Sequence, residues 1–348
     1  MNNEYLYKKI DELLSLEDTL SAKKYLNKIK NKDGIYYYFC GEIKRMEGLL
    51  KDSFDYYLKA LKNLDKKSIF YQRTLLRLIS ILRSKGNIKE VEKYIGILNK
   101  INPRDWDFVL EKAMCLRMKG NFNKALYYFS KLKKKYLNDK DFAGISYIYW
   151  AVGGIFRLKG DFKKSILNFK NAIKYSIKAK DRSLLLYSKF GLAGVLRIAG
   201  KVKESYKEYS QCLKLIDKND YFSKAYYYCG TANALRQMGD YHKAIKNYLI
   251  SYRYYKKTGD NLDLALVLWG LGNAYMKVGR IKLAEGCFLK ANKFFEEGFE
   301  PRGNILNLFS LSYIYYINGK VSKAEKIYFK AINEAKRNNL KTYLEFFT

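Results

Sequence analysis

The chain has 348 residues, of which 48% are hydrophobic and only two are proline, and its formal net charge is +33. It is long enough for two or three domains or for one extended repeat structure, and no Pro-, Gly- or Ser-rich linker divides it. No run of about 18 apolar residues predicts a membrane span, and the amphipathic start lacks the apolar core of a signal peptide.

The first 33 residues predict a degenerate helix pair. Ala22, Leu26 and Ile29 have the spacing of one helix face. We expect this pair to cap the N-terminal end of the structure, because the end of a repeat array must present a polar outer face.

From residue 34 to residue 335 one pattern occurs eight times. Its turn glycines, 34 to 40 residues apart, are Gly48, Gly86, Gly120, Gly160, Gly200, Gly239, Gly279 and Gly319. A small or modest residue stands five positions after each glycine, a bulky one nine positions after, and usually a small one seven positions before. The pattern predicts eight antiparallel helix pairs with a tight turn inside each pair. Residues 336–348 predict a C-terminal capping helix.

The repeat at 268–293 shows the pattern most clearly. A Leu, a Gly and a Tyr at helical spacing precede Gly279, and Ala284, Phe288 and Ala291 follow it. This order resembles the tetratricopeptide repeat (TPR), here in a long form of about 40 residues. The resemblance covers residues 34–335 and implies an all-α fold, a right-handed superhelical solenoid of antiparallel helix pairs.

The resemblance also implies a concave groove lined by the first helix of each pair. The position three residues before the turn glycine is arginine in six successive repeats: Arg45, Arg83, Arg117, Arg157, Arg197 and Arg236. Lysine is the commoner cation in this chain, so the column indicates a use for the planar guanidinium, which binds carboxylate or phosphate at two points and stacks on rings. An equal alternative is a structural role, in which each arginine stacks on an aromatic ring or pairs with an acid of the neighbouring repeat.

Aromatic and amide side chains accompany the arginines in the columns expected to face the groove. They are Tyr147, Trp150, Tyr187, Phe190, Tyr226 and Trp269, with Asn233 and Asn273. Core packing is the alternative for several of the aromatics. Gly191, Gly230 and Gly270, nine positions before their turn glycines, predict a groove floor almost without side chains, although close helix packing accounts for them as well.

Several function classes find no support in the sequence. The five cysteines form no CxxC pair and His242 is the single histidine, so we expect no metal site and no His-based triad. No Walker A motif or paired carboxylates stand out. We expect no catalytic residues and no cofactor, and the separated thiols favour a reducing, cytoplasmic location.

These features predict a non-enzymatic scaffold or adaptor. Its groove would bind an extended protein or peptide segment with acidic and aromatic residues. The alternative is single-stranded RNA in the same basic groove, with phosphates on the arginines and bases on the aromatics. The high lysine content fits an AT-rich genome, yet the charge still attracts anionic partners.

Overall fold

The computed structural model describes residues 3–84, 87–298 and 301–337, and this part of the chain contains eighteen α-helices, one short 3-10 helix and no strand. An N-terminal pair is formed by α1 (Asn3–Ser15) and α2 (Thr19–Leu26). The first helices of the following pairs are α3 (Gly34–Met46), α5 (Ile69–Ser84), α7 (Trp106–Met118), α9 (Phe142–Leu158), α11 (Arg182–Ile198), α13 (Tyr221–Gln237), α15 (Asn261–Lys277) and α17 (Pro301–Ile317). The second helices are α4 (Leu50–Asn63), α6 (Ile88–Ile101), α8 (Phe122–Asn138), α10 (Phe162–Ala179), α12 (Val202–Cys212, followed by η1, Leu213–Leu215), α14 (Tyr241–Thr258), α16 (Ile281–Gly298) and α18 (Val321–Arg337).

Local sequence signals set the ends of the first helices. An aspartate caps six of them, and its carboxylate accepts a hydrogen bond from the backbone N–H three residues later: Asp33, Asp105, Asp141, Asp181, Asp220 and Asp260. The turn glycines within the described part have φ between +71° and +85°, a conformation that side chains with a Cβ resist. Gly86 lies outside the described residues.

The core is built from rings on the second helices. Phe169, on α10, is 2% exposed and lies between two first helices. A Cβ at Gly153 on α9 would lie 3.2 Å from this ring, and a Cβ at Gly191 on α11 would lie 2.2 Å from it. Serine side chains tie the helices of a pair together, as where Ser165 Oγ donates to the carbonyl of Gly153 at 2.8 Å. Phe169 thus joins its own helix pair to the next one.

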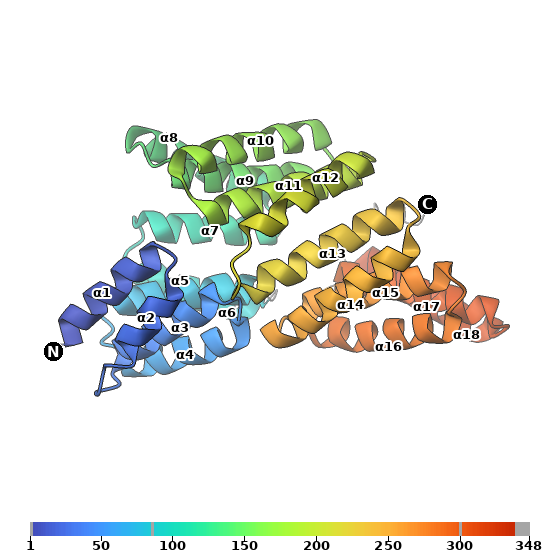
Figure 1. The fold of residues 1–348 in the computed structure, drawn as a ribbon, viewed down its shortest axis with the longest axis horizontal. Coiled ribbons are helices and arrows are strands. Elements are labelled where there is room, and N and C mark those ends of the chain that lie inside the picture. Colours follow the sequence, from blue (N-terminus) through green and yellow to red (C-terminus); the bar gives the residue numbers. More distant parts are fainter. Residues whose placement is uncertain (1–2, 85–86, 299–300, 338–348) are drawn as a thin grey trace.

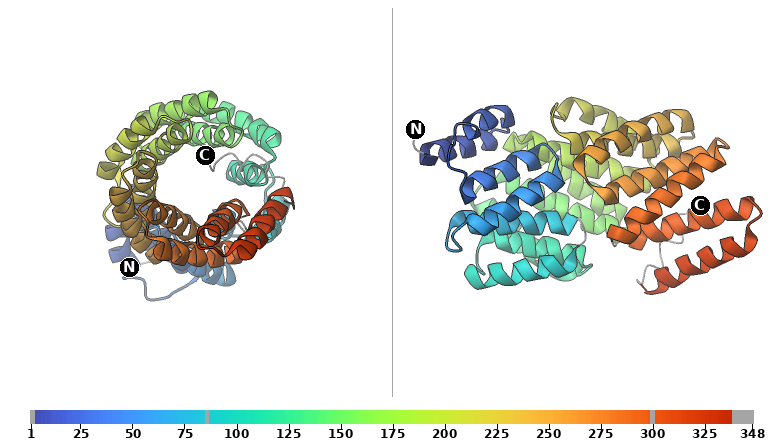
Figure 2. Two further views of the ribbon diagram at one scale, coloured as in Figure 1. Left: turned by 90° about the vertical axis from the view of Figure 1, so that its right-hand side faces the viewer. Right: turned by 90° about the horizontal axis from the view of Figure 1, so that it is seen from below.

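The pairs wind around a common axis (Figures 1 and 2). In the view along this axis the helices form a ring, and the N-terminal pairs lie beside α11–α14, one turn later in the chain. Hydrogen bonds between the turns include that from the backbone N–H of Tyr221 to the carbonyl of Glu47 at 3.3 Å and that from Ser183 Oγ to the Glu17 carboxylate. After one turn, the superhelix therefore contacts its own N-terminal helices.

The all-α repeat solenoid predicted from the sequence is confirmed. The division into a cap, eight repeats and a C-terminal helix stays a prediction; residues 338–348 of the expected capping helix lie outside the described part. No helix in the described ranges is long and apolar enough to cross a membrane.

Candidate functional site

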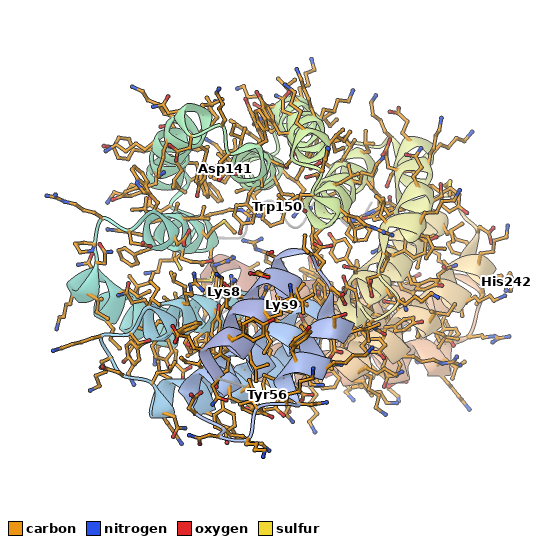
Figure 3. The ribbon with its side chains drawn as sticks, turned by 60° about the vertical axis from the view of Figure 1, so that its left-hand side comes forward. Lys8, Lys9, Tyr56, Asp141, Trp150 and His242 are labelled. Carbon is orange, nitrogen blue, oxygen red and sulfur yellow. The ribbon has the colours of Figure 1, made fainter. Side chains whose placement is uncertain are left out.

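The arginine column occupies the last turns of the first helices. All six side chains are half-buried rather than free in solvent. Trp150, on α9, lies on the inner side of the ring, whereas His242 lies on its outer side (Figure 3). The first helices thus carry the column along the concave face.

The two arginines nearest the N-terminus pair with carboxylates of the chain itself. Arg45 Nη2 donates to Glu42 Oε2 at 3.0 Å, and the same carboxylate accepts from Arg77 Nε at 2.7 Å. Arg83 Nε donates to Glu111 Oε2 at 3.2 Å, and both side chains are only 14% exposed. These guanidiniums already have carboxylate partners within the protein, as the structural alternative expects, and a ligand role for the arginine column stays a prediction.

The next three arginines differ. Within the described residues, Arg117, Arg157 and Arg197 form no ion pair with a carboxylate. The Nε atoms of Arg117 and Arg197, like that of Arg45, are buried without a hydrogen-bond partner. Burial and the neighbouring Arg157 lower the pKa of Arg117 to about 10. Positive charge is therefore concentrated here without a paired carboxylate in the described part of the chain.

Glycines that the sequence analysis did not select make room for this group. A Cβ at Gly154 would lie 2.4 Å from Arg117 Nη2, and a Cβ at Gly194 would lie 3.3 Å from Arg157 Nη1. Both glycines stand six residues before a turn glycine, in a column assigned to the groove. Each arginine thus extends over the first helix of the following repeat. The signal was present in the sequence as two glycines in successive repeats.

Arg236 is held by neighbours of its own repeat and the next. Its Nε donates to the Tyr248 hydroxyl at 3.2 Å, and its guanidinium lies 5.6 Å from the Trp269 ring centre. Asn233 Oδ1 accepts from the same hydroxyl at 2.7 Å, while Asn273 Nδ2 donates to the carbonyl of Trp269 at 2.8 Å. Both amides therefore already have partners within the protein.

The aromatic residues divide into two groups. Trp150 is half-buried beside Tyr147, with ring centres 5.4 Å apart, and Arg117 stacks on it at 5.3 Å. Tyr187 is half-buried and accepts from Ser223 Oγ at 3.2 Å. Phe190, by contrast, is 2% exposed.

Phe190 packs in the core. Its ring centre lies 4.8 Å from that of Tyr226 and 6.1 Å from that of Tyr209. The core-packing alternative therefore describes Phe190, and Tyr226, which packs against it, is half-buried.

Comparison with known proteins addresses the fold. No protein-family model and no curated protein sequence matches the chain. Among solved structures, the Rap protein complexed with Competence and Sporulation Factor is 19% identical, with a TM-score of 0.62 over 78% of each chain. The Cut9–Hcn1 hetero-tetramer of the APC/C is 14% identical, with a TM-score of 0.68 over 94% of this chain and 59% of that one. BtubC from P. vanneervenii is 16% identical, with a TM-score of 0.51 over 66% and 92%.

The Rap and Cut9–Hcn1 structures are TPR-like repeat proteins. The chain has a TPR-type fold. At these identities the likeness shows the fold alone.

One expectation about the TPR groove is wrong. Gly191, Gly230 and Gly270 do not form its floor, because the space of a Cβ at each is taken by the ring of the preceding second helix. The nearest ring atoms would lie at 2.2 Å (Phe169), 2.3 Å (Tyr209) and 2.6 Å (Tyr248). Close helix packing is the physical reason for these glycines.

Other reactive groups of the TPR-type chain do not assemble into a site. In the described ranges no group of three or more His, Cys, Asp or Glu side chains could hold a metal ion. The cysteines are free thiols, three buried and two half-buried, and burial raises the pKa of Cys212 to about 12.

Proposed function

We propose that the protein is a non-enzymatic scaffold that holds an extended, acidic protein segment along its concave groove. The observation that supports this most is the run of Arg117, Arg157 and Arg197, which have no ion pair within the described part of the chain. Half-buried guanidiniums lose hydration, and an incoming carboxylate supplies the charge-assisted hydrogen bonds that water no longer gives. Trp150, Tyr147 and Tyr187 offer apolar surface for aromatic residues of the same segment.

The spacing of the repeats suggests the form of that segment. Neighbouring helices pack about 8–10 Å apart, and an extended chain rises roughly 3.3 Å per residue. Successive arginines therefore match acidic residues about three positions apart. The TPR-type fold of the Rap complex is consistent with an interaction role for this chain, and the free thiols support a cytoplasmic location.

The test is binding of a fluorescent peptide with aspartate at every third position, measured by anisotropy at physiological salt. Replacing Arg157 and Arg197 together by alanine should weaken binding at least tenfold, since a hydrogen bond to a charged group contributes about 1.5–3 kcal/mol. The matched control is Arg104→Ala with Arg253→Ala, which removes the same charge from two exposed positions. The control should bind within about twofold of the unmodified protein.

Two results would contradict the proposal. A large fall in melting temperature with unchanged peptide affinity would make the arginines a structural ladder. The second result is tight binding of an oligo-U strand at physiological salt that the same double substitution abolishes, which would favour RNA as the ligand. If the strand is held only by nonspecific attraction, its affinity should fall steeply as salt rises.

A further inference from the structure

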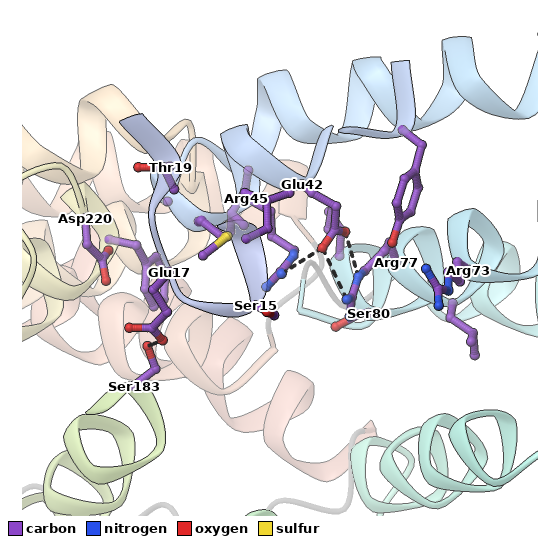
Figure 4. Close-up of a pocket in the computed structure, with 18 of the residues that line it drawn as sticks. Ser15, Glu17, Thr19, Glu42, Arg45, Arg73, Arg77, Ser80, Ser183 and Asp220 are labelled. Carbon is purple, nitrogen blue, oxygen red and sulfur yellow. Dashed lines mark hydrogen bonds and ion pairs between the residues drawn. The ribbon is translucent and has the colours of Figure 1, made fainter. Parts of the chain in front are cut away.

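A cavity of about 880 Å³ lies where the two turns of the superhelix meet (Figure 4). Residues of α1, α3, α5 and α7 line one side, and residues of α11, of the loop before α13 and of α13 itself line the other. Its volume is in the range of clefts that hold a small ligand or a few peptide residues. Because α7 carries both Glu111 of the cavity wall and Arg117, the cavity adjoins the unpaired arginines along the groove.

The charge of this cavity is opposite to that of the whole chain. Seven acidic and three basic side chains line it, in a protein with a formal net charge of +33. The three arginines already have anionic partners: Glu42 takes Arg45 and Arg77, and Arg73 lies 3.7 Å from Asp11. Figure 4 shows Glu42 between its two arginines.

Some carboxylates of the cavity form no ion pair within the described residues. Asp107, on α7, and Asp217, in the loop before α13, form no ion pair with a Lys or Arg in the described ranges. Asp217 accepts a hydrogen bond from the backbone N–H of Asn219 at 2.8 Å. Burial, and then the nearby Asp105, raise the pKa of Asp107, whereas Arg77, Arg73 and Lys135 lower it without forming an ion pair with this carboxylate.

We infer that this cavity docks basic residues of the partner segment whose acidic residues bind Arg117, Arg157 and Arg197; the inference rests on the proposed function. The groove then has two charge zones. Arginine or lysine side chains of the segment enter the acidic cavity, and its aspartates or glutamates continue along the central arginines. The partner is a bipolar segment, with a basic cluster about three to six residues from the first acidic one.

The net charge of the chain alone predicts that arginines added to the peptide weaken its binding. A chain of +33 repels a basic extension, so added arginines should weaken binding unless a local acidic site accepts them. The probes are three labelled peptides that share one acidic core with aspartate at every third position. One carries Arg-Arg-Gly-Ser-Gly before the core, one carries Gly-Ser-Gly-Arg-Arg after it, and one has glutamines in place of the arginines.

The 348-residue protein should bind one of the two arginine peptides about fivefold or more tightly than the glutamine peptide at physiological salt. The variant Asp107→Asn with Asp217→Asn should lose this gain while binding the glutamine peptide as before. Asparagine keeps the shape of both side chains and removes only their charge. A melting curve matching the unmodified protein confirms that the variant is folded.

The outcomes separate the two proposals. If the glutamine peptide binds but arginines at either end weaken binding, or if the gain survives in the double variant, the cavity does not dock basic residues and the proposed function stands. If the glutamine peptide fails to bind, the proposed function falls and this inference falls with it.

Discussion

Replacing Gly191 by alanine tests how the repeats pack. The new Cβ would lie 2.2 Å, 2.5 Å and 2.8 Å from three atoms of the Phe169 ring, far inside contact distance. Overpacking of this kind costs about 1–3 kcal/mol, and alanine regains about 1 kcal/mol in a helix interior. The difference is a net loss of up to about 2 kcal/mol in the free energy of unfolding, and we expect a value near this upper end because Phe169 is 2% exposed and has little room to move.

The assay is urea denaturation followed by circular dichroism, with Gly286→Ala as the matched control. Gly286 lies inside α16, and a Cβ there would have no neighbouring atom within 4 Å, so alanine should stabilise the protein by about 0.5–1 kcal/mol. The two variants should move the midpoint in opposite directions. If Gly191→Ala stabilised the protein as Gly286→Ala does, the ring would not fill this space and an open groove floor would be the better account.

Three further variants test the charges. Glu42→Gln should lower the free energy of unfolding by about 3 kcal/mol, because it leaves two arginines without their shared carboxylate. These arginines lower the pKa of the buried Glu42 to about 2. The unmodified protein should therefore lose this stabilisation as pH falls from about 4.5 towards 2, whereas the variant should not. Burial and Asp260 raise the pKa of Asp263 to about 7, so ionisation of Asp263 should destabilise the unmodified protein as pH rises from about 4 to 7. The Asp263→Asn variant should therefore have a higher melting temperature than the unmodified protein at pH 7.5, but not at pH 4. Gly154→Ala should displace the Arg117 guanidinium and weaken acidic-peptide binding severalfold with little change in melting temperature, and unchanged affinity would show that this position of Arg117 is not needed.

The repeat architecture was predictable because its signals are local. A turn glycine with positive φ, an aspartate cap and a ring nine residues after the glycine each act within one helix pair, and their recurrence fixes the register of the others. Phe169 illustrates the limit: its position was predicted, but its contact with Gly191 joins two repeats. A sequence column cannot show which neighbour fills the space beside a glycine.

The groove was predictable only as a set of columns. Arg83 and Arg157 occupy equivalent positions, yet Arg83 pairs with Glu111 of the next repeat, whereas Arg157 has no such carboxylate in the described part. The difference depends on single residues of neighbouring helices. The cavity was not predictable at all, because residues such as Glu17 and Ser183 meet only after the small rotations between repeats accumulate into a full turn.

The most direct measurement is an NMR titration that follows the arginine side-chain Nε–Hε signals while the acidic peptide is added. The account predicts shifts at Arg117, Arg157 and Arg197, because these groups form no ion pair within the described chain. It predicts no change at Arg77 and Arg83, whose Nε atoms already donate to Glu42 and Glu111. Shifts confined to Arg77 and Arg83, or no shifts while the peptide is bound, would contradict it.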